Sequence, residues 1–99
     1  MKIKYEKNDI KVSKINHRDT FDLFTLLAQI NYKTLKAFKK HNTGYPSELT
    51  SEGWDEILDD MIKAFKLILE DKNDYSVENQ EAIEHGLNLF SKYFMHLWR

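Results

Sequence analysis

The chain has 99 residues, of which 15 are Lys or Arg and 16 are Asp or Glu, so its formal net charge is -1 at pH 7. This length allows one domain with a modest core, and the near-neutral charge gives no field that would attract nucleic acid or anionic lipid, so a nucleic-acid partner is not expected. The absence of cysteine excludes disulfides, thiolate zinc sites and cysteine nucleophiles, and it is compatible with a reducing cytoplasm.

Residues 1–18 are predicted to form an extended arm or a short hairpin. Apolar and charged positions alternate on both sides of a polar stretch, the apolar positions being Ile3, Tyr5, Ile10 and Val12. Two strands are not stable by themselves. The arm therefore docks on the helices, pairs with another chain, or is loose.

No export signal or membrane span is expected. The first residues contain no apolar run of signal-peptide length. Nowhere does the chain hold about 18 uncharged apolar residues in succession. We therefore expect a cytoplasmic protein with no membrane partner.

The remaining residues predict an all-α fold, a small bundle of three helices at about 19–40, 51–71 and 76–97. These helices would form one domain over residues 19–99.

The first predicted helix, with Asp19 or Thr20 as its cap, has apolar side chains over roughly two thirds of its circumference, wider than the stripe of a surface helix. It is therefore expected to be central in the bundle or to be covered by a second copy, which predicts a homo-oligomer. Its polar stripe contains Lys33, Lys36 and Lys40, the densest basic feature of the chain.

A loop at residues 41–50 contains the only proline, and Pro46 biases Tyr45 towards an extended conformation. Thr50 or Ser51 can cap the second helix, which has one compact apolar face and an acidic solvated face. Both Tyr45 and Pro46 are expected at the surface, as contact residues for a partner.

The third predicted helix is capped by Ser76 and has an apolar face that ends at Trp98, whose ring is expected to anchor the C-terminal end. Gly86 lies near the middle of this face. There it costs about 1 kcal/mol of helix propensity relative to alanine. Close approach of a neighbouring helix explains it better.

No sequence motif specific for a reaction is present. The chain has no Gly-rich phosphate loop, no Gly-x-Ser-x-Gly, no His-Glu-x-x-His and no zinc-ligand spacing. The alignment of Glu81, His85 and His96 on one helix face is interpreted as a solvated surface, as is the acidic set that opens the second helix. We therefore expect no catalytic residues, no metal and no cofactor.

The lysine stripe supports a more specific hypothesis. Lys33, Lys36 and Lys40, with His41 after them, could hold phosphates, and Tyr45 could stack on a base. The alternative is that these lysines simply line the solvated side of a helix. The candidate ligand-binding or partner-binding residues are Lys33, Lys36, Lys40, His41, Tyr45 and Pro46.

Two patterns support a resemblance. One begins at Gly44 and reads Gly-Tyr-Pro-x-x-Leu-Thr-x-x-x-Trp-Asp-x-Ile-Leu, and the other, from Gly86 to Trp98, reads Gly-Leu-x-Leu-Phe-x-Lys-Tyr-Phe-x-x-Leu-Trp. Together they resemble a group of small helical proteins encoded by bacteriophages. The chain departs from that group at Gly53, where similar sequences tend to carry Glu, the capping-box partner of Thr50.

The resemblance implies a phage origin and an action by binding. The expected function is a non-enzymatic binding protein that inhibits a host factor, such as a defence system, in the host cytoplasm. One alternative is a sponge that sequesters a small nucleotide signal, which would use the lysine stripe. Another is a virion or scaffolding component.

Overall fold

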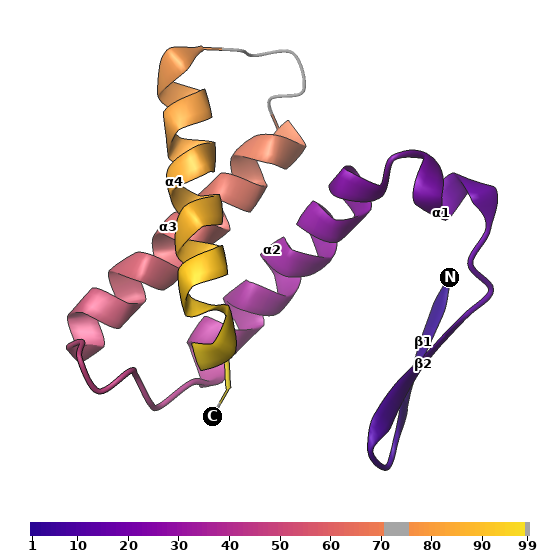
Figure 1. Ribbon diagram of the computed structural model, residues 1–99, viewed down its shortest axis with the longest axis horizontal. Helices are drawn as coiled ribbons and strands as arrows, with labels where there is room; N and C mark the ends of the chain where they lie inside the picture. Colours follow the sequence, from indigo (N-terminus) through magenta and orange to yellow (C-terminus); the bar gives the residue numbers. More distant parts are fainter. Residues whose placement is uncertain (71–75, 99) are drawn as a thin grey trace.

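The computed structural model describes residues 1–70 and 76–98. The elements in this part are a β-hairpin, four α-helices and a short 3-10 helix: β1 (Lys2–Glu6), β2 (Asp9–Ser13), α1 (His17–Phe21), α2 (Leu23–His41), α3 (Ser51–Glu70), α4 (Val77–Tyr93) and η1 (Phe94–His96) (Figure 1). The predicted mostly helical class with an N-terminal hairpin is confirmed. The predicted number of three helices is wrong.

The first predicted helix is two helices, because the chain bends at Asp22. α1 begins earlier than expected, at a cap formed by Asn16 and not by Asp19 or Thr20. The Asn16 side chain accepts from the Asp19 N–H at 3.1 Å, and the Asp19 carboxylate accepts from the Asn16 N–H at 3.0 Å. These two bonds make a capping box. Asp22, at φ -128° and ψ 63°, ends α1 and precedes α2.

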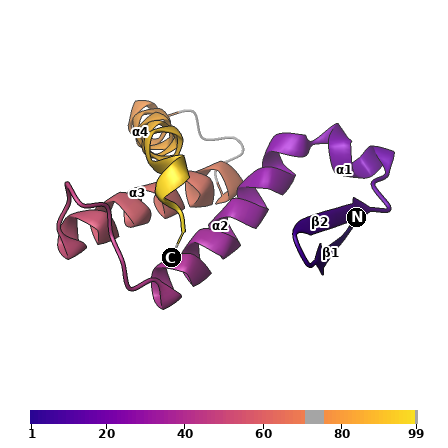
Figure 2. The same cartoon turned by 60° about the horizontal axis from the view of Figure 1, so that its bottom comes forward.

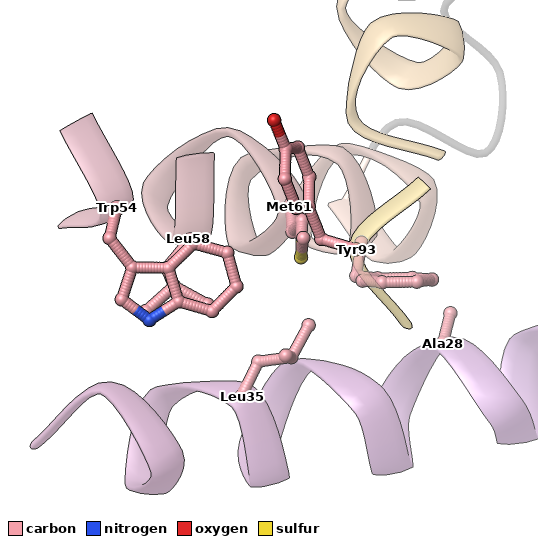
Figure 3. Packing of buried hydrophobic residues seen from close by; sticks show 7 residues of the cluster. Ala28, Leu35, Trp54, Leu58, Met61 and Tyr93 are labelled. Carbon is pink, nitrogen blue, oxygen red and sulfur yellow. The ribbon is translucent and has the colours of Figure 1, made fainter. Parts of the chain in front are cut away.

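α3 is the central helix, and it packs against α2 and against α4 (Figures 1 and 2). The first predicted helix is therefore not central, and the alternative, that a second copy covers its apolar side, stays a prediction. Figure 3 shows Ala28 and Leu35 projecting from α2 towards α3. The buried hydrophobic residues are Ala28, Leu35, Trp54, Leu58, Met61, Ala64, Phe65 and Tyr93, most of them from α3.

The predicted caps of α3 and α4 are confirmed. Thr50 caps α3, since its hydroxyl oxygen accepts from the Gly53 N–H at 3.0 Å. Ser76 caps α4 by accepting from the Asn79 N–H at 3.3 Å. The predicted end of the second helix at residue 71 lies outside the described residues. α4 ends at Tyr93, four residues before the predicted end at residue 97, and the chain continues as the 3-10 helix η1 to His96.

Gly86 is buried where α4 meets α3, which confirms the predicted close approach. A Cβ at this position would lie 2.3 Å from the Ala64 Cβ and 2.6 Å from the Asp60 carbonyl oxygen. Only glycine allows the two backbones this separation. His85, next to it, places Nε2 3.1 Å from the Asp60 carboxylate on the solvent side of the same contact.

The hairpin projects from the helical part of the molecule. β1 and β2 pair antiparallel, with Ile3 opposite Val12 and Tyr5 opposite Ile10. Within the described ranges, neither strand packs against a helix, and both views show the hairpin apart from α2 (Figures 1 and 2). The radius of gyration is accordingly 15.1 Å, above the about 13 Å of a compact domain of this length.

Candidate functional site

A groove runs between α2 and α4. Both helices pack on α3, but across residues 1–70 and 76–98 no Cα of α2 lies within 8 Å of one of α4. The helices instead diverge from the C-terminal end of the molecule (Figure 1). The space between them includes a cavity of about 240 Å³. It is lined by Asn31, Thr34, Leu35 and Phe38 of α2 and by Phe90, Phe94 and Leu97.

The α4 side of this groove is built on aromatic rings that pack edge to face. Phe65 of α3 meets Phe90 edge to face, with centroids 5.3 Å apart, and Phe90 meets Phe94 in the same manner at 5.4 Å. This series runs from the core to the surface, and Phe94 remains 56% exposed. An exposed ring held by ordered neighbours loses little side-chain entropy when a partner covers it.

The α2 side adds apolar surface and few polar groups. Thr34 donates its hydroxyl to the Ile30 carbonyl at 2.7 Å, so its polar hydrogen is used within the helix. One helical turn before Asn31, Leu27 is 47% exposed and continues the same side of α2. On α4, Leu87 continues the row of Phe90 and is also exposed. The groove can therefore hold apolar side chains of a partner segment.

Sequence reasoning missed this groove. It correctly identified the apolar faces of the helices that form it, but it did not place these faces on the two sides of a groove. A helical pattern shows which side chains share a face; it does not show where two helices diverge from a third.

The predicted lysine stripe lies outside the groove between α2 and α4. Only two of its three lysines line the same depression. Lys36 and Lys40 line a depression of about 360 Å³ with Lys39, Asp59 and Ile62, and Lys33 does not line it. Lys39 donates to the Asp59 carboxylate at 2.6 Å, which raises the pKa of Lys39 above its ordinary value. A carboxylate among these lysines weakens their attraction for phosphate.

Tyr45 and Pro46 lie at a third place. They line a cavity of about 300 Å³ beside the C-terminal end, together with Gly44, Ser47, Glu48, His96 and Trp98. Pro46 is buried, so its predicted surface position is wrong. The reason is a turn in which the Leu49 N–H donates to the Pro46 carbonyl at 3.0 Å while Leu49 packs on the core.

The structure also differs from the expectation for Trp98, and it places His41 apart from the three cavities. Trp98 is 73% exposed, so its ring is not anchored in the core. His41 is exposed at the end of α2 and lines none of these cavities. The six candidate residues therefore do not form one site.

Ionisable side chains are scattered over the surface. In the part of the chain that the structure describes, no three His, Asp or Glu side chains come together as a metal site would require. The His85–Asp60 pair is exposed on both sides. None of the described helices combines the length and the apolar character needed to cross a membrane.

No protein-family model, no curated protein and no solved structure matches this chain. The resemblance to phage-encoded proteins stays a prediction. Among the three cavities described above, the one between α2 and α4 has the most large apolar side chains in its lining: Leu35, Phe38, Phe90, Phe94 and Leu97.

Proposed function

We propose that the protein is a non-enzymatic, phage-type binding protein that inhibits a host factor by holding an apolar segment of that factor in the groove between α2 and α4. The observation that supports this proposal is the aromatic series ending in the half-exposed Phe94. Two diverging helices over a third form a groove suited to an amphipathic helix, whose apolar residues recur every three or four positions. A host segment bound in the groove can no longer make its normal contacts in the host factor or with that factor's partners. The host factor is inhibited for this reason.

The energetics favour the groove over the lysines as the main contact. Burying the exposed part of Phe94 alone stabilises a complex by roughly 1–2 kcal/mol. Exposed lysines contribute about 0–1 kcal/mol per ion pair. Phe, Met and Trp are also enriched at interfaces, whereas Lys is depleted.

The test is capture of host proteins on the immobilised protein, comparing two adjacent substitutions. Phe94→Ser removes a groove ring, and Met95→Ser removes a side chain that is 81% exposed and does not line the groove. We expect the wild type and Met95→Ser to retain the same host protein and Phe94→Ser to lose it. Equal capture by all three, with equal far-UV circular dichroism, would exclude the groove.

A second candidate function is a sponge for a small nucleotide, favoured by the shared depression of Lys36 and Lys40. Replacing both by Glu should then abolish nucleotide binding in calorimetry without unfolding the protein. The matched control is Lys33→Glu, on the same helix but outside the depression. If nucleotides released by heating the purified protein are absent and calorimetry shows no heat, this candidate is eliminated.

A further inference from the structure

The hairpin has an apolar face that none of the other described residues, in 14–70 and 76–98, covers. In the register of β1 and β2, alternation places Ile3, Tyr5, Ile10 and Val12 on one face. All four are between 46% and 81% exposed. The opposite face carries Lys2, Lys4 and Lys11 with Glu6 and Asp9. An amphipathic two-stranded ribbon of this kind needs a surface to cover its apolar face.

A second bare apolar surface lies at the beginning of α2. Leu23, Phe24 and Leu27 are 46–67% exposed there, one or two turns before the groove. Residues 23–32 carry no charge at all. A solvent-facing helix normally carries charged residues on its outer side, so this half of α2 has the composition of an interface.

The hairpin is held away from this surface in its own chain. The capping box between Asn16 and Asp19 fixes the entry into α1, and the Met1 amine lies 3.3 Å from the Asp19 carboxylate. Lys14, between hairpin and helix, has φ 55°, a left-handed conformation that redirects the chain. These contacts attach the hairpin to α1, so its apolar face does not reach α2 of the same chain (Figure 2).

We propose that the hairpin of each copy lays its apolar face on the first half of α2 of a second copy, in a two-fold dimer. A two-fold pairing presents the same patches twice, so each hairpin has an α2 to cover and each α2 is covered. Together with Ile15, the residues of the two surfaces expose on the order of 900 Å² of total surface per chain, and a standard interface takes about 800 Å² from each partner. The same dimer contact therefore covers both exposed apolar surfaces.

The charges around the two surfaces are complementary. Residues 1–14 contain five lysines and two acids, Glu6 and Asp9. The charged groups next to the bare part of α2 are Arg18, Asp19 and Asp22. Asp19 is paired with the Met1 amine of its own chain, and Asp22 makes no capping bond to the backbone. The basic hairpin therefore meets a helix start whose acidic groups outnumber its basic one, and this difference in charge favours the pairing.

Sedimentation velocity over a concentration series tests the dimer. The wild type should dimerise, and replacing both Tyr5 and Ile10 by Ser should raise the dissociation constant at least tenfold. The matched control replaces Lys4 and Lys11 by Thr. These lysines face each other on the opposite side of the same strands. Their removal keeps the apolar face and relieves repulsion within the hairpin, so it should raise the dissociation constant far less than the loss of Tyr5 and Ile10, by the small share that charge attraction contributes. A wild type that is monomeric at every concentration overturns the proposal.

A second variant separates lost contacts from a melted hairpin. Replacing Leu23 and Leu27 by Gln keeps good helix formers in α2 and leaves the hairpin untouched. It should weaken the dimer at least tenfold with unchanged circular dichroism. An unchanged dissociation constant would show that α2 is not the covered surface.

Cross-linking identifies which surfaces meet, because the chain has no cysteine of its own. A chain with Val12→Cys and a chain with Leu27→Cys are mixed and treated with a short bis-maleimide. The proposal predicts a covalent pair in the mixture that neither chain forms alone. A covalent pair in the Val12→Cys sample alone would mean that two hairpins pack face to face, and it would overturn the proposed arrangement.

Discussion

At Gly86, α4 lies so close to α3 that a side chain has no room. We predict that Gly86→Ala lowers the free energy of unfolding by roughly 1–2 kcal/mol, because overpacking outweighs the gain in helix propensity. Urea denaturation measures this difference. The Asp60 carbonyl, one of the two obstacles, is backbone and cannot turn aside.

Gly44 provides the matched control for this substitution. A Cβ at Gly44 would meet no atom within 4 Å, and no glycine among the described residues has positive φ. Gly44→Ala should therefore leave stability unchanged or raise it slightly. Adding Ala64→Gly to Gly86→Ala removes the other obstacle and should restore part of the loss. A Gly86→Ala protein as stable as the wild type would mean that the helices are further apart.

Asp19 links the hairpin to α1, and its protonation is predicted to loosen that link. The pKa of Asp19 is lowered, first by the hydrogen bond from the Asn16 N–H and then by the Met1 amine and Arg18. A lowered pKa means that the stabilisation is fully present above the ordinary value of 3.8 and is lost as the pH falls through the folded value. NMR titration of the carboxyl should give a midpoint below 3.8.

The same experiment after acetylation of the Met1 amine should give a midpoint closer to the ordinary value, because one positive charge is gone. Asp19→Asn should increase hydrogen exchange in α1 at neutral pH. An Asp19 midpoint that acetylation leaves unchanged would rule out the ion pair.

At the scale of elements, we predict that a substitution at the beginning of α3 can increase the stability of the protein. Gly53 donates to the Thr50 cap but offers no side chain to complete a capping box. Gly53→Glu should raise the free energy of unfolding by about 1 kcal/mol, through helix propensity and the reciprocal bond to the Thr50 N–H. Thermal denaturation measures it, with Gly53→Ala as the control for propensity alone.

Adding Thr50→Ala should abolish the difference between Glu and Ala at position 53, because the box needs both members. The Thr50 hydroxyl would lie 3.1 Å from a Cβ at this position and must yield slightly. If Gly53→Glu and Gly53→Ala are equally stable beside an intact Thr50, no box forms.

Local signals predicted the elements where they were unambiguous. The caps Thr50 and Ser76 and the close approach at Gly86 follow from side-chain chemistry within a few residues. The bend at Asp22 does not, because apolar periodicity continues through it. The Asn16–Asp19 capping box is equally local, but the prediction placed the cap at Asp19 or Thr20. The prediction therefore merged α1 with α2.

At the scale of the whole molecule, the sequence did not reveal which apolar surfaces would find a neighbour. α2 is the most widely apolar helix, but α3 is central, because α3 meets both other long helices. The candidate residues Lys36 and Tyr45 belong to different cavities for the same reason. The arrangement of the helices in space decides which apolar surfaces are covered. The apolar periodicity of the sequence does not show that arrangement. The surplus apolar surface was predictable; its division into a groove, a hairpin face and a bare half of α2 was not.

The most direct test of the proposed function places a photoreactive phenylalanine analogue at Phe94, in the groove, and in a second protein at Lys63, an exposed position on α3. Both proteins are irradiated in host lysate. If the host factor binds in the groove, the probe at position 94 forms one dominant adduct with a host protein, and the probe at position 63 does not form this adduct. The same adduct from both positions, or none from position 94 while the wild type still captures its host protein, would contradict binding in the groove.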